Sequence, residues 1–200
     1  MLFRSTFGIG CLGFNLFYAN TWPILLSGPI LIYLCGYSFT KRFTQWSHFC
    51  LGSSIALSPV AAWLAVCPET LGIPALLLML IVTCWIGGFD IIYACQDIDM
   101  DRRDGLFSIP ANLGPAKALW IARTSHLTAV AGLIALGVVA PLGVIYAVGV
   151  VVAAALLVVQ NVLVRPTDLR RVNLAFSLNG VVSIIFAAAA ITDVLVSPTM

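Results

Sequence analysis

The chain has 200 residues, of which 61% are hydrophobic and only 9% charged, and its mean hydropathy is +1.06. Soluble domains carry roughly 25% charged residues, so this composition excludes a water-exposed globular fold and indicates a protein whose main solvent is lipid. The formal net charge of +2 says little about an acidic partner, and we expect no nucleic acid to bind.

Seven apolar runs approach the ~20 residues that a helix needs to cross a bilayer. They predict an all-α integral membrane protein, a transmembrane bundle of about seven helices. The first run opens almost at Met1 and fits either a short span or the core of a signal peptide, although "FYANTW" is a poor cleavage site, which favours the span. The runs cover residues 6–20, 22–38, 48–66, 73–95, 118–139, 141–163 and 172–195.

Lysine and arginine fall before the first run and in or beside alternate connections between the runs. By the positive-inside rule, those connections and the N-terminus lie in the cytoplasm, while the C-terminus and Cys67 lie outside. The ten basic residues are Arg4, Lys41, Arg42, Arg102, Arg103, Lys117, Arg123, Arg165, Arg170 and Arg171.

A first polar cluster, "YSFTKRFT" at residues 37–44, follows the second apolar run. Tyr37 and Lys41 are four residues apart and therefore share one face of a helix. Lys41 and Arg42 are either ordinary positive-inside anchors beside an interfacial tyrosine, or groups that neutralise a bound diphosphate. Their position in the sequence leaves both interpretations open.

A second polar cluster, "YACQDIDMDRRDG" at residues 93–105, holds four of the eight acidic residues. If the fourth helix continues through this segment, its aspartates align with Asp90, because positions separated by multiples of about 3.6 share a face. Tyr93 lies on the same face and Asp99 on the opposite one, before Gly105 and Pro110 end the helix and turn the chain. The aligned aspartates are Asp90, Asp97, Asp101 and Asp104.

These aspartates need a compensating cation, because a carboxylate inside an apolar run costs at least ~2.5 kcal/mol on insertion scales. Asp97 and Asp101 suit Mg²⁺, which proteins typically hold with one or two carboxylates plus substrate phosphates. The alternative is a solvated loop in which Asp99 and Asp104 pair with the neighbouring arginines. The metal interpretation implies a phosphate or diphosphate substrate.

The two clusters together resemble a known family. "DIIYACQDIDMDRRDGLFSIP", residues 90–110, is similar to the second aspartate-rich motif of the UbiA superfamily of intramembrane aromatic prenyltransferases. Asp97 and Asp101 occupy its D-x-x-x-D positions, and Asp90 and Tyr93 a preceding D-x-x-Y. "YSFTK" resembles the family's Y-x-x-x-K, "FSLNGVVS" with Asn179 resembles its last helix, and the resemblance covers essentially the whole chain.

The resemblance implies a bundle, of nine helices in the full family, in which Mg²⁺ and a polyprenyl diphosphate meet between two aspartate-rich motifs. The allylic cation left by the diphosphate would alkylate an aromatic acceptor, such as 4-hydroxybenzoate or a naphthoate in ubiquinone or menaquinone biosynthesis. The similarity to the 4-hydroxybenzoate polyprenyltransferase-like branch implies a bacterial inner membrane. Asp97 and Asp101 would be the catalytic metal ligands; Tyr37, Lys41, Arg42 and Arg103 would bind diphosphate, supported by Asp90, Tyr93, Asp104 and Asn179.

The sequence also departs from the family pattern. It contains no N-D-x-x-D-x-x-x-D, which is the family's first motif, and Phe107 stands where many members carry a basic residue. We therefore expect residues 1–200 to form a single transmembrane prenyltransferase-like domain that is N-terminally incomplete and has little or no turnover of its own. The alternative is an inactive remnant that at most binds isoprenoid diphosphate.

Two other membrane classes are disfavoured. CDP-alcohol phosphotransferases carry D-G-x-x-A-R before their aspartates, and this sequence has no such pattern. A retinal protein needs a Schiff-base lysine in its last helix, and residues 172–195 contain no lysine.

Overall fold

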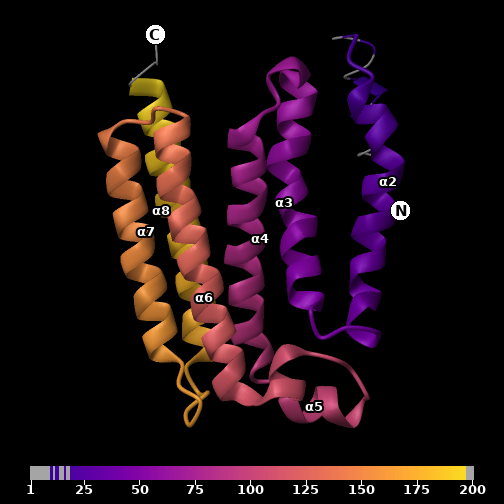
Figure 1. The fold of residues 1–200 in the computed structure, drawn as a ribbon, viewed down its shortest axis with the longest axis vertical. Coiled ribbons are helices and arrows are strands. Elements are labelled where there is room, and N and C mark those ends of the chain that lie inside the picture. Colours follow the sequence, from indigo (N-terminus) through magenta and orange to yellow (C-terminus); the bar gives the residue numbers. More distant parts are fainter. Residues whose placement is uncertain (1–9, 11, 14–15, 17–18, 197–200) are drawn as a thin grey trace.

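The computed structural model describes residues 10, 12–13, 16 and 19–196, and this part of the chain contains helices and connections but no β-strand (Figure 1). Two of the helices, η1 and η2, are of the 3₁₀ type, and α5 is a short helix outside the long ones. The elements are α2 (Trp22–Gly36), η1 (Tyr37–Arg42), α3 (Ser47–Val66), η2 (Pro68–Thr70), α4 (Ile73–Ala94), α5 (Ile98–Arg103), α6 (Ile109–Val139), α7 (Val144–Leu163) and α8 (Val172–Val196).

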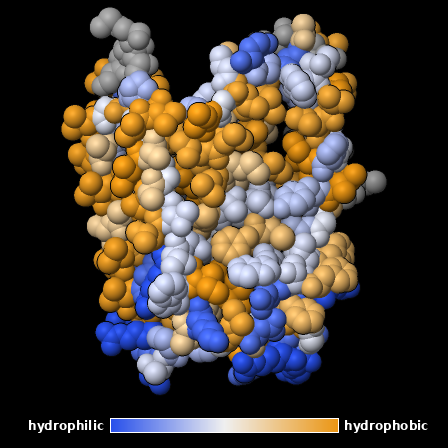
Figure 2. Space-filling view, in the orientation of Figure 1, coloured by the Kyte–Doolittle hydropathy of each residue, from blue (hydrophilic) through white to orange (hydrophobic). Residues whose placement is uncertain are grey.

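Within the described residues, six helical segments are long and apolar enough to cross a membrane. They confirm six of the seven predicted runs, while the first run, at residues 6–20, lies largely outside the described residues. Figure 2 shows hydrophobic side chains over most of the height of the visible face, with hydrophilic ones gathered most densely at the end where α5 lies. The chain is therefore an all-α, multi-pass membrane bundle.

Helix α4 is the centre of this bundle and packs along both α3 and α6, while α7 packs along α8 (Figure 1). The contact between α3 and α4 is close because glycines lie in it. A Cβ added at Gly52 would collide with the carbonyl oxygen of Thr83 and lie 3.1 Å from the backbone nitrogen of Gly87. Small residues allow such backbone approaches between helices in lipid, where apolar burial supplies little drive for packing.

The continuous helix predicted through the aspartates is wrong. Helix α4 ends at Ala94, and the next three backbone N–H groups, of Cys95, Gln96 and Asp97, bond to carbonyls three residues back, which tightens and ends the helix. Asp97 then becomes the N-cap residue of α5, a position that aspartate favours over a helix interior. Helix α5 lies across the end of the bundle (Figure 1).

Helix α6 begins at Ile109, nine residues before the predicted start at residue 118. Pro110 therefore lies in its first turn, where a missing N–H costs nothing, and does not end a helix as predicted. The side chain of Ser108 accepts a hydrogen bond from Ala111 N at 3.3 Å and caps the helix. Gly114, at φ 79°, interrupts the helix just before Pro115, so α6 is kinked five residues after its start.

Candidate functional site

A cavity of about 240 Å³ lies where η1, the start of α3 and the end of α4 meet. Half of its lining consists of residues that the sequence singled out: Tyr37, Lys41, Asp90, Tyr93 and Asp97. The other lining residues are Ser38, Ser47, His48, Leu51 and Ala94. Two sequence motifs, at residues 37–41 and 90–97, therefore contribute to one polar cavity.

Lys41 connects this cavity to Asp101. Its Nζ lies 2.7 Å from Asp101 Oδ1, with the lysine side chain 31% exposed and the aspartate side chain only 3% exposed. The second carboxylate oxygen, Oδ2, is buried and has no hydrogen-bond partner among the described residues. An unsatisfied buried acceptor is costly, so this oxygen is suited to accept a further cation or donor.

Backbone contacts hold Lys41 in place. The N–H of Phe107 donates to the Lys41 carbonyl at 2.7 Å, and the N–H of Leu106 donates to the Asp101 carbonyl at 2.8 Å. The loop between α5 and α6 is thus fixed to η1 on one side and to α5 on the other. The α5–α6 loop therefore positions Lys41 and Asp101 together, although η1 and α5 are distant in the sequence.

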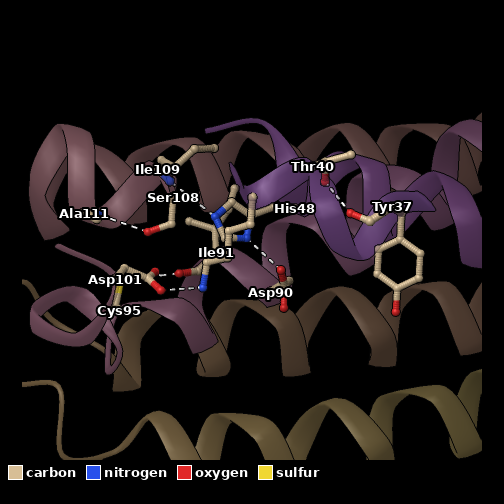
Figure 3. A network of polar contacts seen from close by, with 11 residues as sticks. Tyr37, Thr40, His48, Asp90, Ile91, Cys95, Asp101, Ser108, Ile109 and Ala111 are labelled. Atoms are coloured by element: carbon tan, nitrogen blue, oxygen red, sulfur yellow. Dashed lines mark hydrogen bonds and ion pairs between the residues drawn. The ribbon is translucent and has the colours of Figure 1, made fainter. Parts of the chain in front are cut away.

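His48 links α3, α4 and α6 at the inner wall of the cavity (Figure 3). Its Nδ1 lies 2.7 Å from Asp90 Oδ2, and its Nε2 lies 3.3 Å from the backbone nitrogen of Ile109. Because a backbone N–H can only donate, Nε2 is the acceptor, and Nδ1 carries the proton that is donated to Asp90. The imidazole is 2% exposed and the Asp90 side chain 28% exposed, so the carboxylate, held by His48, faces the cavity.

An aromatic cluster adjoins the site. Tyr93, which lines the cavity, has its ring 5.5 Å from that of Phe176 on α8, and Phe176 lies 5.4 Å from Phe89. Aromatic faces stabilise nearby cations through the ring quadrupole. The cluster therefore places rings beside the polar cavity, on the side toward α8.

Five of the predicted site residues do not line this cavity: Asp101, which pairs with Lys41 of the lining, and Arg42, Arg103, Asp104 and Asn179. Arg42 is exposed, with its guanidinium carbon 5.6 Å from the centre of the Phe39 ring. Arg103 and Asp104 pair with each other at 3.4 Å on the exposed surface of the α5 end, as the solvated-loop interpretation expects of Asp104. Asn179 accepts a hydrogen bond from Trp85 Nε1 at 2.8 Å and thereby joins α8 to α4.

Cys95 lies behind the site and is 2% exposed. Burial raises the pKa of its thiol to about 12, and Sγ donates to the Ile91 carbonyl at 3.4 Å. Since the thiolate is the nucleophilic and metal-binding form, Cys95 acts as a packed apolar residue here.

The carboxylate oxygens of the site can bind a hard cation only if a bound ligand supplies further oxygen atoms. Among the described residues, no group of three or more His, Cys, Asp or Glu side chains is close enough to enclose a metal ion. Asp97 in the cavity and the unpartnered Oδ2 of Asp101 offer carboxylate oxygens on one short helix. Such a set fits Mg²⁺ that also takes phosphate oxygens and water, as this ion commonly does.

Sequence reasoning missed His48 and Ser47. A signal for His48 was present: Asp90 and His48 each lie near the end of an apolar run, and both runs end on the side that carries the basic residues. Ionisable groups inside membrane spans generally pair with one another. A partner for Asp90 was therefore to be expected among the ionisable residues at that end of the spans, and His48 is one of them.

The chain is similar to known proteins of one family. The model of the UbiA prenyltransferase family matches residues 1–190. The apo structure of a UbiA homolog from Aeropyrum pernix K1 is 35% identical, with a TM-score of 0.76 over 87% of this chain and 65% of that one.

Two curated relatives are the mitochondrial 4-hydroxybenzoate polyprenyltransferase of Arabidopsis thaliana and the 4-hydroxybenzoate octaprenyltransferase of Serratia proteamaculans. The first is 32% identical over 64% of this chain and 33% of its own length, the second 35% identical over 44% and 30%. The chain spans about a third of the length of the curated relatives it matches.

Proposed function

Because the chain belongs to the UbiA prenyltransferase family, we propose that it transfers a polyprenyl group from polyprenyl diphosphate to an aromatic acceptor such as 4-hydroxybenzoate or a naphthoate. The observation that carries this proposal is the shared cavity of Tyr37, Lys41, Asp90, Tyr93 and Asp97. The relatives named as 4-hydroxybenzoate polyprenyltransferases support the aromatic acceptor. In the reaction, the C1–O bond of the donor breaks with its electron pair going to diphosphate. A ring carbon of the acceptor forms the new bond to C1 and gives up its proton to the released diphosphate or to water.

Lys41 has two roles in this proposal. Without substrate, its ammonium group neutralises Asp101 at 2.7 Å. When a diphosphate enters the cavity, Lys41 is already at the lining and turns toward the phosphate oxygens, with the Tyr37 hydroxyl as a further donor. Charge-assisted hydrogen bonds of this kind are about twice as strong as neutral ones.

Asp97 and Asp101 would hold Mg²⁺ together with the diphosphate. Bound there, the ion would neutralise charge that develops on the leaving diphosphate. The movement of Lys41 toward the substrate would free Asp101 Oδ1 in addition to the unpartnered Oδ2. Arg42 and Arg103, exposed beside the site, would contribute longer-range positive charge rather than direct contacts.

The aromatic rings and the His48–Asp90 pair would serve the organic half of the reaction. The rings of Tyr93, Phe89 and Phe176 lie where an allylic cation can be stabilised next to the polar cavity. His48 fixes the orientation of Asp90 by its 2.7 Å contact, and the oriented Asp90 carboxylate forms part of the cavity wall. His48 is a positioning residue in this account, because it acts through Asp90.

The site would face the cytoplasm of a bacterial cell, in the inner membrane. This orientation rests on the basic residues of η1, α5, the first half of α6 and the α7–α8 loop. Lipid would surround the six spans, so the prenyl donor can enter from the bilayer while its diphosphate stays at the aqueous end.

A second candidate is a chain that binds isoprenoid diphosphate without turnover. Two observations favour it: Asp101 is already neutralised by Lys41, and the sequence has no N-D-x-x-D-x-x-x-D cluster to hold a second ion. Removing one preorganised stabiliser of developing charge typically costs ~10² to 10³ in rate. For the chain by itself we therefore expect binding with slow turnover.

An assay with polyprenyl diphosphate and 4-hydroxybenzoate separates the two candidates. The chain is measured alone, and again after fusion to a two-helix segment that carries N-D-x-x-D-x-x-x-D. Enzyme function predicts product from the fusion in Mg²⁺, little from the chain alone, and at least a hundredfold loss in the Asp97→Asn fusion, with Asp104→Asn as the matched control. No product from either form, with diphosphate still bound, would support the binding-only candidate and contradict the enzyme.

A further inference from the structure

A second and larger cavity, of about 600 Å³, lies between α6 and α7, away from the proposed active site. It is a groove with apolar walls, formed by Leu127 and Val130 on α6 and by Ala154, Leu157, Val158 and Val162 on α7. Leu127 is 69% exposed and Val158 62% exposed, so the groove opens on the outer surface of the bundle. In a membrane, this surface faces lipid.

The floor of the groove is polar and joins the two helices. The Asn161 side-chain amide nitrogen donates to His126 Nδ1 at 2.7 Å and to the Leu157 carbonyl at 2.8 Å. His126 is 3% exposed, so this contact lies beneath the apolar walls. The bridge fixes the spacing of α6 and α7 and keeps the groove between them open.

Two arginines stand at one end of the groove. Arg123 and Arg165 both line it, and Arg123 Nη2 lies 3.4 Å from the Asn161 carbonyl, at the last turn of α7. Neither arginine forms an ion pair with a carboxylate in the described part of the chain. Figure 2 shows the half of the visible face that α6 and α7 form. It is mostly hydrophobic in its upper part and hydrophilic at its lower end.

We propose that this groove binds an anionic glycerophospholipid, with the headgroup phosphate on Arg123 and Arg165 and an acyl chain along the apolar walls. The choice of ligand rests on charge complementarity, because two guanidinium groups without a carboxylate partner among the described residues lie at one end of an apolar groove. Basic pockets between transmembrane helices bind anionic headgroups in this way. A zwitterionic lipid offers the same acyl chain but brings its own cation, which the arginines repel.

Native mass spectrometry of the full chain tests the proposal. The protein is released from nanodiscs of equal phosphatidylglycerol and phosphatidylcholine content, and the lipid that remains bound is identified. We expect phosphatidylglycerol to be enriched, and Arg123→Ala/Arg165→Ala to lower the enrichment by about tenfold, since each basic group near an anionic surface contributes measurably. Arg170→Ala/Arg171→Ala, exposed on the same loop but outside the groove, is the matched control and should leave the enrichment unchanged.

Two further variants fix the position of the lipid. Arg123→Lys/Arg165→Lys keeps both charges and should retain most of the enrichment, which separates a charge effect from misfolding. Ala154→Trp fills the groove and should reduce bound lipid of both kinds. Equal retention of the two lipids by the unmodified chain, unchanged enrichment in the double alanine variant, or displacement of the bound lipid by farnesyl diphosphate would each overturn the proposal.

Discussion

At the residue scale, His48 is the least obvious part of the site and the most constrained. It is 2% exposed, and both ring nitrogens are engaged, one with Asp90 and one with Ile109 N. The geometry has Nδ1 donating to Asp90 and Nε2 accepting from the backbone N–H of Ile109. A single side chain thus sets the orientation of the Asp90 carboxylate and the start of α6.

Replacing His48 separates these two contacts. His48→Ala leaves both partners unsatisfied and should lower the free energy of unfolding by about 1–3 kcal/mol per lost contact. His48→Asn can still donate to a carboxylate and should recover part of the loss. Thermal unfolding in detergent and farnesyl diphosphate binding are measured for both variants.

The control for His48 is His126, which is equally buried but lies in the α6–α7 groove. His126→Asn should change stability without weakening diphosphate binding. The positioning role is contradicted if His48→Ala and His48→Asn bind diphosphate as tightly as the unmodified chain.

The residues of the cavity were predictable from sequence to different degrees. The motifs that contain Tyr37, Lys41, Asp90 and Asp97 are short, so their spacing in the sequence is independent of how the helices pack. Asp101 was also found, but its burial and its pairing with Lys41 depend on α5 folding back against the bundle, which no local pattern encodes. Arg42 and Arg103 illustrate the reverse case, since basic residues at a membrane surface look alike whether or not they face the site.

At the element scale, the close packing of α3 against α4 fixes the distance between His48 and Asp90. Gly52 makes this contact possible. Gly52→Ala should lower the free energy of unfolding by about 1–3 kcal/mol, because the added methyl group meets backbone atoms of Thr83 and Gly87 that cannot rotate away. The same change should weaken diphosphate binding by shifting α3 against α4.

Gly28 in α2 supplies the matched control, since a Cβ there meets nothing within 4 Å. Gly28→Ala should leave stability unchanged or raise it slightly, because alanine has the higher helix propensity. Melting temperatures in detergent compare the two variants. Equal melting temperatures for both would show that α3 and α4 are not held at the distance described.

Element boundaries were the weaker part of the sequence prediction. The apolar runs located six spans, because length and hydropathy are local properties. The break after Ala94 and the early start of α6 at Ile109 were missed, because hydropathy alone does not mark where a helix begins or ends. Ser108 as a capping residue, followed by Pro110 in the first turn, was the signal that a helix begins there.

At the scale of the whole molecule, η1, α5 and the α7–α8 connection, which carry most of the basic residues, lie at one end of the bundle, and the connection between α3 and α4, which holds Cys67, lies at the other end (Figure 1). A membrane-impermeant maleimide applied to intact cells should label the exposed Cys67. It should not label Asp104→Cys in a Cys67→Ser background. The opposite labelling pattern would place the site outside the cell.

The central claim is that Asp97 and Asp101 bind a metal only together with a diphosphate in the cavity lined by Lys41. Titration calorimetry of farnesyl diphosphate, with Mg²⁺ and with EDTA, measures this directly on the purified chain. We expect Mg²⁺-dependent binding that falls at least tenfold in Asp97→Asn and in Asp101→Asn, while Asp104→Asn, on the exposed end of α5, binds as the unmodified chain does. If all three variants bind farnesyl diphosphate equally well in Mg²⁺, the account is contradicted and the solvated-loop interpretation of the aspartates is favoured.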